Sequence, residues 1–301
     1  MAEGEILIFD RRAVRRHRER AALQGGAEFL LEETAERLAQ RLEDVTRRFP
    51  RALALGARGG ILARALAGRG GIETLIEMEE APGLFASGTR GALVAEAEAL
   101  PFVTGAFDLV VSCLTLHWTN DLPGALLQLR GALRPDGLLL AALFGGETLG
   151  ELRGAFLEAE LALESGASPR VAPMADGRDL AGLLQRAGFA LPVVDSDRLT
   201  VTYGDAFALM ADLRAMGETN GLRERRRGFT RRATMLRMAE LYRDRHGGPD
   251  GRIPASFEIV TLTAWAPHAS QPKPLRPGSA AARLADALGT EEKSVGEKSG
   301  R

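Results

Sequence analysis

The sequence is poor in the residues that bind metals or form disulfides. It has one cysteine, Cys113, and four histidines among 301 residues. A single cysteine cannot form an internal disulfide or a CxxC metal site, which excludes disulfide stapling and thiolate zinc binding. The histidines, at positions 17, 117, 246 and 268, show no HxD or HxxxH spacing. Because a non-haem iron site usually combines two histidines with a carboxylate, we predict no metal site.

Lysine and long apolar segments are also scarce. Lysine occurs at positions 273, 293 and 298 alone, so almost all positive charge comes from arginine, and the formal net charge is -1. A near-neutral chain lacks the excess positive charge that binding to nucleic-acid phosphates needs, so we expect no specific binding to nucleic acid. No segment approaches the ~20 apolar residues of a membrane span, and the first residues do not form a signal peptide. At most peripheral membrane contact is expected, in a reducing compartment.

What is present is an alternation of strands and helices. Short apolar strands are predicted at 52–55, 72–78, 92–94, 107–113 and 138–143, with amphipathic helices at 28–45, 61–67 and 121–133 among them. This alternation predicts an α/β fold with a mainly parallel, Rossmann-like sheet. Further helices are predicted at 180–187, 206–216 and 230–245, and strands at 193–201 and 257–265.

The predicted organisation has three parts. Residues 1–50 form N-terminal helices, which include a basic helix at 9–22. Residues 51–267 form the sheet domain, with helical insertions at about 145–190 and 205–250. Residues 268–301, which contain several prolines, glycines and scattered charges, are expected to form a mobile tail.

A glycine-rich turn follows the first predicted strand. Gly56, Gly59 and Gly60 lie between strand and helix, where glycine lets the backbone approach a ligand closely. Glu77 closes the second strand, where an acid can accept hydrogen bonds from both ribose hydroxyls. Glu96 closes the third strand, where adenine would lie. With no Walker lysine in the chain, this order of elements indicates a nucleoside ligand without a polyphosphate.

Several strings give the chain a specific resemblance. It is similar to the class I S-adenosylmethionine-dependent methyltransferases through the glycine turn, FDLVVS and LRPDG. Within them, FDR, LHWTNDLP, FGGETLGELR, MADLRAMGETN, RRATM and WAPHASQPKP resemble the respiratory complex I assembly factor 5 family and its bacterial relatives. The resemblance covers residues 9 to about 280. It implies a seven-stranded sheet whose last strand is antiparallel, with the cofactor at the carboxyl ends of the first strands.

The resemblance also implies a cofactor pocket for S-adenosylmethionine. The residues expected to line it are Gly56, Ala57, Gly60, Glu77, Met78, Glu96, Ala97 and Ser112. The family usually has an acid two positions before the first glycine, which helps to hold the methionine ammonium, and a glycine two positions after it. Here these positions are Ala54 and Arg58. Arg58 could fold outward, pair with the cofactor carboxylate or block the site.

The candidate catalytic residues follow two later strands. His117, beside Trp118, comes after the fourth strand, where a substrate would meet the cofactor, and is a candidate base. Glu147, after the fifth strand, could hold a guanidinium or amine. A packing histidine and a solvated loop acid are the alternatives. Cys113, inside a buried strand, is expected to be a small core residue.

Three functions remain open from the sequence. The first is a cofactor-dependent enzyme that modifies a protein side chain, by methylation or arginine hydroxylation, in respiratory complex I assembly. Its substrate would be a protein, such as a complex I subunit, in the bacterial cytoplasm. The second is a non-catalytic assembly chaperone with a degenerate cofactor site, and the third is a carboxyl O-methyltransferase of a carrier-protein thioester or small molecule.

Overall fold

The structure is a computed structural model that describes residues 7–56, 58–272 and 289–290. Contacts between Cα atoms divide the chain into one unit that ends at Pro267 and a second that begins at His268, and the first is described here. Most of the predicted tail at 268–301 lies outside the described residues.

The helices of the first unit are α1 (Arg11–Gln24), α2 (Phe29–Gln40), α3 (Ile61–Leu66), α4 (Leu122–Ala132), α5 (Gly150–Leu163), α6 (Gly177–Arg186), α7 (Ala206–Ala215) and α8 (Arg232–His246), with the short 3-10 helices η1 (Pro82–Leu84) and η2 (Leu116–Trp118). Its strands are β1 (Arg51–Leu55), β2 (Thr74–Glu79), β3 (Ala92–Val94), β4 (Phe107–Cys113), β5 (Leu133–Phe144), β6 (Ala190–Tyr203) and β7 (Ile253–Trp265).

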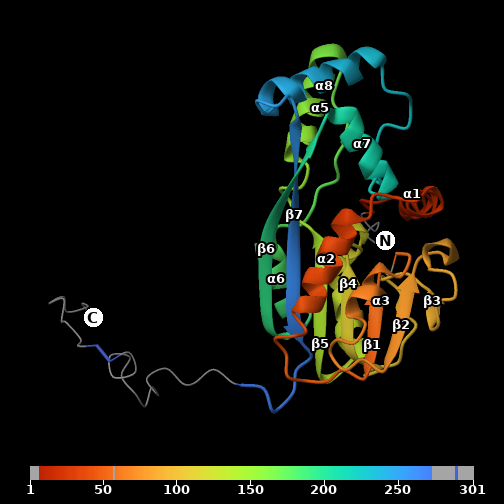
Figure 1. The fold of residues 1–301 in the computed structure, drawn as a ribbon, viewed down its shortest axis with the longest axis vertical. Helices are drawn as coiled ribbons and strands as arrows, with labels where there is room; N and C mark the ends of the chain where they lie inside the picture. The colour runs from red at the N-terminus through yellow and green to blue at the C-terminus, as the bar shows by residue number, and fades with distance from the viewer. Residues whose placement is uncertain (1–6, 57, 273–288, 291–301) are drawn as a thin grey trace, which may run out of the picture. The chain divides into compact units, whose positions relative to one another are not determined.

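These strands form one seven-stranded sheet in the order β3-β2-β1-β4-β5-β7-β6 (Figure 1). Pairing is parallel from β3 through β5, whereas β7 runs antiparallel to both β5 and β6. The predicted α/β fold, with its antiparallel last strand, is therefore confirmed. Because β1 to β5 are parallel, their carboxyl ends share one edge, and the loops that leave this edge can build a single site.

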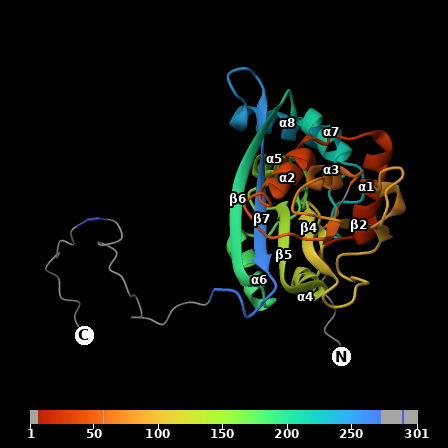
Figure 2. The same cartoon turned by 60° about the horizontal axis from the view of Figure 1, so that its bottom comes forward.

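Helices cover both faces of this sheet (Figure 2). Side chains that alternate along β4 point to opposite faces, as the period of a strand requires. Leu109 and Val111 pack in the cluster that contains Leu38 of α2, and Val110 packs in the cluster that contains Leu126 of α4. Burial on both faces explains why β4 reads as an uninterrupted apolar run.

Several strands are longer than the sequence predicts. β6 and β7 pair over twelve positions, from Ala190 opposite Trp265 to Tyr203 opposite Ile253. At the end where Tyr203 pairs with Ile253, α5, α7 and α8 gather beside the two long strands (Figure 1). β5 begins at Leu133 rather than Leu138, because Leu133 already pairs with Phe107 before a register shift. The RPDG segment, which directly follows the helix predicted at 121–133, thus lies inside a strand.

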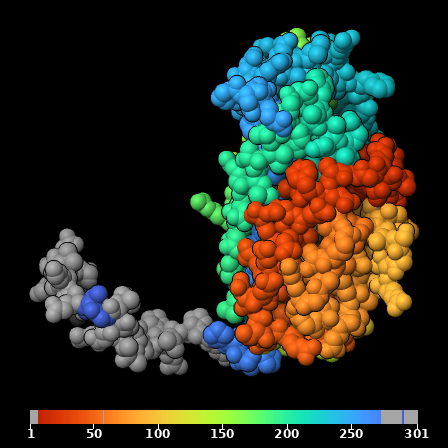
Figure 3. All heavy atoms as spheres, in the orientation of Figure 1, coloured from red at the N-terminus to blue at the C-terminus, as the bar shows by residue number. Residues whose placement is uncertain are grey.

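Helix α1 lies beside the carboxyl edge of the sheet. It contacts η1 and α7, and Figure 3 shows residues 7–24 between the segment that contains α7 and the segment of residues 60–90. Asp10 caps the helix by accepting a hydrogen bond from the Ala13 N–H at 3.1 Å, and it pairs with Arg225 at 2.9 Å. The buried face of α1 includes Arg18, so this helix brings a buried cation to the sheet edge.

Candidate functional site

The glycine turn after β1 is tightly packed. Gly56 has a φ of 76°, and its N–H donates to the Met78 carbonyl at 3.2 Å. A Cβ at Gly56 would lie 2.0 Å from Thr115 Oγ1, so no other residue fits without displacing the backbone. Gly60, also left-handed at 76°, precedes α3. Ala57 lies outside the described residues.

Next to this turn, two predicted cofactor ligands have unmet hydrogen bonds. Within the described part of the chain, Glu77 Oε2 and Ser112 Oγ are buried and have no hydrogen-bond partner. Glu77 is 7% exposed, and burial raises the pKa of its carboxyl. Buried polar atoms without partners are costly, so ligand hydroxyl groups that satisfied them would be favoured. Glu77 is in register with Ala54 and Ser112 with Leu55, so the two side chains point to opposite faces of the sheet. The unmet carboxyl oxygen of Glu77 by itself fits a ribose hydroxyl of S-adenosylmethionine.

The other predicted pocket residues are distributed unevenly. Met78 and Ala97 pack in the same hydrophobic cluster, which suits an apolar surface against a nucleobase. Glu96 is exposed in the turn after β3. The sheet therefore places Met78 and Ser112 on one face, on either side of Leu55, and Glu77 on the opposite face, while Glu96 is exposed.

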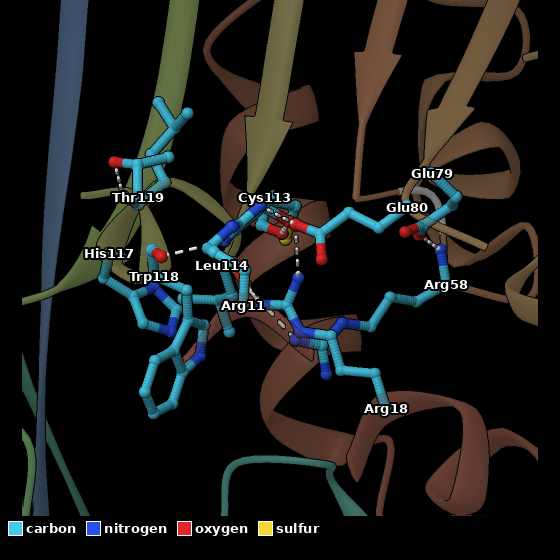
Figure 4. Close-up of polar contacts among 12 residues, drawn as sticks. Arg11, Arg18, Arg58, Glu79, Glu80, Cys113, Leu114, His117, Trp118 and Thr119 are labelled. Atoms are coloured by element: carbon cyan, nitrogen blue, oxygen red, sulfur yellow. Dashed lines mark hydrogen bonds and ion pairs between the residues drawn. The ribbon is translucent and has the colours of Figure 1, made fainter. Parts of the chain in front are cut away.

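Arg58 folds into the molecule rather than outward. Its N–H donates to Glu79 Oε1 at 2.7 Å (Figure 4), and its guanidinium donates to the Met216 carbonyl at 2.6 Å and to Glu218 Oε1 at 2.5 Å. Its φ of 37° is in the left-handed region, which costs a residue with a side chain roughly 1–2 kcal/mol. The ion pair with Glu218 offsets this strain.

Glu218, in the loop after α7, joins the elements of the site. Besides Arg58, it accepts hydrogen bonds from Trp118 Nε1 at 2.7 Å and from His117 Nε2 at 3.1 Å. Burial acts against its charge, yet Arg58, His117 and Arg18 hold the pKa of Glu218 well below its usual range. Burial lowers the pKa of His117 despite the contact with Glu218, so its ring is neutral at pH 7 and donates from Nε2.

Two arginines of α1 complete the charged group. Arg11 pairs with Glu80 at 2.5 Å and donates to the Trp118 carbonyl. Arg18 is 1% exposed, donates to the Leu114 carbonyl at 3.2 Å and lies 3.8 Å from Glu218. Burial and the neighbouring Arg58 lower the pKa of Arg18 to about 10, so it stays charged at neutral pH. The charged cluster, which we define as Arg11, Arg18, Arg58, Glu79, Glu80 and Glu218, has three arginines and three glutamates (Figure 4 labels all but Glu218). Burial raises the pKa of Glu79 within it.

Two cavities meet at this cluster. The loop cavity, of about 160 Å³, is lined by Arg18, Arg58, Gly59, Leu114, Met216 and Glu218 among others. The helical cavity, of about 360 Å³, lies among α5, α7 and the segment of residues 170–174. Its lining includes Trp118, Phe156, Met210 and Phe257, and also Arg170, Arg214, Arg225 and Arg226. Phe144 and Glu218 line both cavities and separate one from the other.

The two candidate catalytic residues are not brought together. His117 has a side chain 1% exposed, directly beside Glu218 and 4.8 Å from the Phe144 ring. Glu147 has a side chain 70% exposed and pairs with Arg198 of β6 at 3.1 Å. His117 thus lies in the site, whereas Glu147 lies on the surface and faces neither cavity.

Sequence reasoning missed Arg18, Glu79 and Glu218. Glu218 lies in the GETN string, which contributes to the family resemblance, but no spacing in the sequence links it to Arg58. Arg18 belongs to a helix whose many arginines suggest solvent exposure. The available signal was its spacing: Arg18 lies four residues after Val14 and three before Ala21, on the same face of the helix.

Other classes of site are not found in the described residues. Within 7–56, 58–272 and 289–290, no three His, Cys, Asp or Glu side chains are grouped to hold a metal ion. No helix in that part of the chain is long and apolar enough to cross a membrane.

The sheet order, the glycine turn and the acids at the end of β2 define a class I methyltransferase-type enzyme. The model of the methyltransferase domain family matches residues 53–141. A protein from Bacillus halodurans C-125, provisionally described as a methyltransferase, superposes with a TM-score of 0.52 at 14% identity over 77% of this chain and 99% of that one.

Full-length relatives define the family more narrowly. The mitochondrial arginine hydroxylase NDUFAF5 of Mus musculus is 40% identical over 95% of this chain and 87% of its own length. The malonyl-[acyl-carrier protein] O-methyltransferase of Halorhodospira halophila is 36% identical over 88% of this chain and 91% of its own. The chain therefore belongs to the methyltransferase family that contains both relatives, as the sequence strings predicted.

Proposed function

We propose that the protein binds S-adenosylmethionine and modifies a side chain of a protein during the assembly of respiratory complex I. The observation that carries the cofactor proposal is the buried, unmet carboxyl oxygen of Glu77 on the strand beside the glycine turn. The acceptor is proposed from the 40% identity to proteins named as arginine hydroxylases. We place the protein in the bacterial cytoplasm, because its relatives named as malonyl-[acyl-carrier protein] O-methyltransferases are bacterial.

The residues of the chain have distinct parts in this proposal. When bound, S-adenosylmethionine supplies an activated methyl group. Glu77 accepts hydrogen bonds from the ribose, and the apolar side chains of Met78 and Ala97 exclude water from the nucleobase. The substrate side chain enters the helical cavity, whose wall at Phe144 and Glu218 is shared with the loop cavity. Orientation across that wall is the main contribution the chain can make to the reaction.

Calorimetric titration with S-adenosylmethionine and S-adenosylhomocysteine tests the cofactor proposal. We expect binding by the natural chain and loss of about tenfold or more in affinity for Glu77→Gln, because a hydrogen bond to a charged group contributes roughly 1.5–3 kcal/mol. Glu73→Gln is the matched control, since Glu73 has a side chain 65% exposed just before the same strand. Absence of heat with both ligands would refute the cofactor proposal.

Complementation of a deletion strain tests the assembly role. Gly56→Asp puts a charged side chain where even a Cβ meets Thr115, so an enzyme should not tolerate it. Full rescue of complex I assembly by a folded Gly56→Asp chain would favour the non-catalytic chaperone. In the natural strain, mass spectrometry of complex I subunits should show an added methyl group that is missing after deletion. An added oxygen atom would instead indicate hydroxylation, which needs an oxidant that S-adenosylmethionine does not supply.

A second candidate, carboxyl methylation of a carrier-protein thioester, is supported by the arginines of the helical cavity. Four arginines, at positions 170, 214, 225 and 226, line it, and such residues can recognise a carboxylate. The 36% identity to a malonyl-[acyl-carrier protein] O-methyltransferase adds to this support. This candidate predicts loss of methyl transfer to a malonyl carrier-protein thioester and intact complex I on deletion, which the first proposal does not.

A further inference from the structure

We propose that the loop cavity receives the zwitterionic amino-acid end of S-adenosylmethionine, with its carboxylate on Arg18 and its ammonium on Glu218. The inference rests on the proposed cofactor and adds the part of the pocket that the glycine turn does not explain. It assigns Glu218 the role that the missing acid at Ala54 would have had. Ala54 is fully buried in β1 and has no charge to offer.

Arg18 supplies the first observation. Its side chain is 0% exposed, and among the described residues its Nε and Nη1 have no hydrogen-bond partner. Nη1 lies 4.0 Å from Glu80 Oε1, too far for a hydrogen bond. A buried guanidinium with two unused donors is costly as it stands. A carboxylate accepts two parallel N–H groups from one guanidinium. Nη1 and the second N–H of Nη2 form such a pair, so Arg18 is suited to hold a carboxylate where it lines the loop cavity.

Glu218 supplies the acceptor on the same cavity. Three donors, from Arg58, His117 and Trp118, use its two oxygens. An ionised carboxylate has about four lone-pair positions, which leaves room for one more donor. The Leu114 carbonyl, which already accepts from Arg18 and Arg58, lines the cavity beside it. An ammonium group there would meet one anionic and one neutral acceptor.

Charge balance favours a zwitterion over a simple ion. The loop cavity is lined by two arginines, Arg18 and Arg58, and two glutamates, Glu28 and Glu218, and neighbouring His117 is neutral at pH 7. An isolated anion or cation would leave one unbalanced charge in a buried site, at a high cost. An α-amino acid group brings one charge of each sign, and Arg18 and Glu218, 3.8 Å apart, match the two ends.

Paired ligands test the inference. S-adenosylhomocysteine has the amino-acid end, and methylthioadenosine lacks it while keeping the nucleoside. In calorimetric titrations of the full chain, Arg18→Gln and Glu218→Gln should weaken S-adenosylhomocysteine binding by roughly 10- to 100-fold. Methylthioadenosine should bind both variants within about twofold of the natural chain, which also shows that they are folded. Arg20→Gln, exposed on the same helix, is the control and should leave both ligands unaffected.

The outcomes separate this inference from the cofactor proposal. If neither ligand binds the natural chain, the cofactor proposal fails and takes this inference with it. Both ligands could bind the natural chain while the variants weaken the two ligands equally or leave both affinities unchanged. That result would overturn this inference and leave the cofactor proposal intact. Should Arg18→Gln not fold, Arg18→Lys keeps the charge but cannot donate two parallel hydrogen bonds, and it should still show the selective loss.

Tryptophan emission gives a second readout. The chain has two tryptophans, and Trp118 donates to Glu218. In a Trp265→Phe background, S-adenosylhomocysteine should change the emission of Trp118 and methylthioadenosine should not. Equal responses to the two ligands would count against a contact between the amino-acid end and Glu218.

Discussion

The buried pair of Arg58 and Glu218 should contribute strongly to stability. Their side chains are 13% and 7% exposed and lie 2.5 Å apart. Breaking a buried pair by removing one partner costs about 3–5 kcal/mol, because the other charge stays buried. Arg58→Gly should lose less, roughly 1–3 kcal/mol, since glycine relieves the left-handed strain worth about 1–2 kcal/mol. Glu218→Gln should lose the full amount, because it leaves two buried arginines under-compensated.

A double-mutant cycle measures the pair itself. We expect a coupling free energy of roughly 2 kcal/mol or more between Arg58→Gly and Glu218→Gln, obtained from urea denaturation of the single and double variants. Arg237 and Glu240 form the matched control, an i,i+3 pair on α8 with side chains 43% and 55% exposed. Exposed helix pairs couple by about 0.2–0.5 kcal/mol.

The coupling free energies of the two cycles test whether Arg58 and Glu218 form a buried pair. A coupling at Arg58 and Glu218 no larger than that of the control would mean that Arg58 does not reside in the interior. A folded double variant that is more stable than either single variant would support the argument, because it removes both buried charges at once.

Three further predictions concern the turn, a histidine and the cysteine. Gly56→Ala should destabilise the chain by about 2–4 kcal/mol from strain and overpacking, measured by urea denaturation. Gly59→Ala, with a similar φ of 65° but no described atom within 4 Å, should cost only the strain. The buried, neutral His117 should contribute stability above its unfolded pKa of ~6.5 that is lost as pH falls below it, because the unfolded chain protonates first. His117→Gln should therefore flatten the melting temperature between pH 7 and 5, and an unchanged profile would contradict the assignment. Burial raises the pKa of Cys113 to about 12, so Ellman's reagent should label it only in denaturant; rapid labelling of the native chain would contradict its burial.

The sheet could be predicted because its signals are local. The apolar run of β4 and the glycines after β1 lie within short segments, and each reflects burial or backbone conformation at its own position. Strand ends were less certain: Leu133 joins β5 because it pairs with Phe107, a contact that no local pattern encodes. The same applies to the long pairing of β6 and β7.

The site could be predicted only where strand ends define it. Glu77 was predicted as a ribose ligand because an acid at the end of the second strand has a known place in such folds. The structure extends β2 to Glu79 and leaves a buried carboxyl oxygen of Glu77 without a partner, and the ribose role stays a prediction. The direction of Arg58 was left open, since its partner Glu218 lies 160 residues away and reaches it only through the packing of α7 on the sheet edge. Glu147 was favoured by its position after a strand, yet its side chain is 70% exposed and pairs with Arg198 of β6, two strands away in the sheet.

Glu218 links the two cavities, and this has a consequence for any reaction in them. It accepts from Arg58 on the side of the loop cavity, while Trp118, which also donates to it, lines the helical cavity. A cation that binds Glu218 in the loop cavity shares its two oxygens with these donors. We therefore expect the hydrogen bond from Trp118, which lines the helical cavity, to respond to filling of the loop cavity. Because such coupling is reciprocal, a ligand that fits the helical cavity must change the affinity of the loop cavity by the same factor.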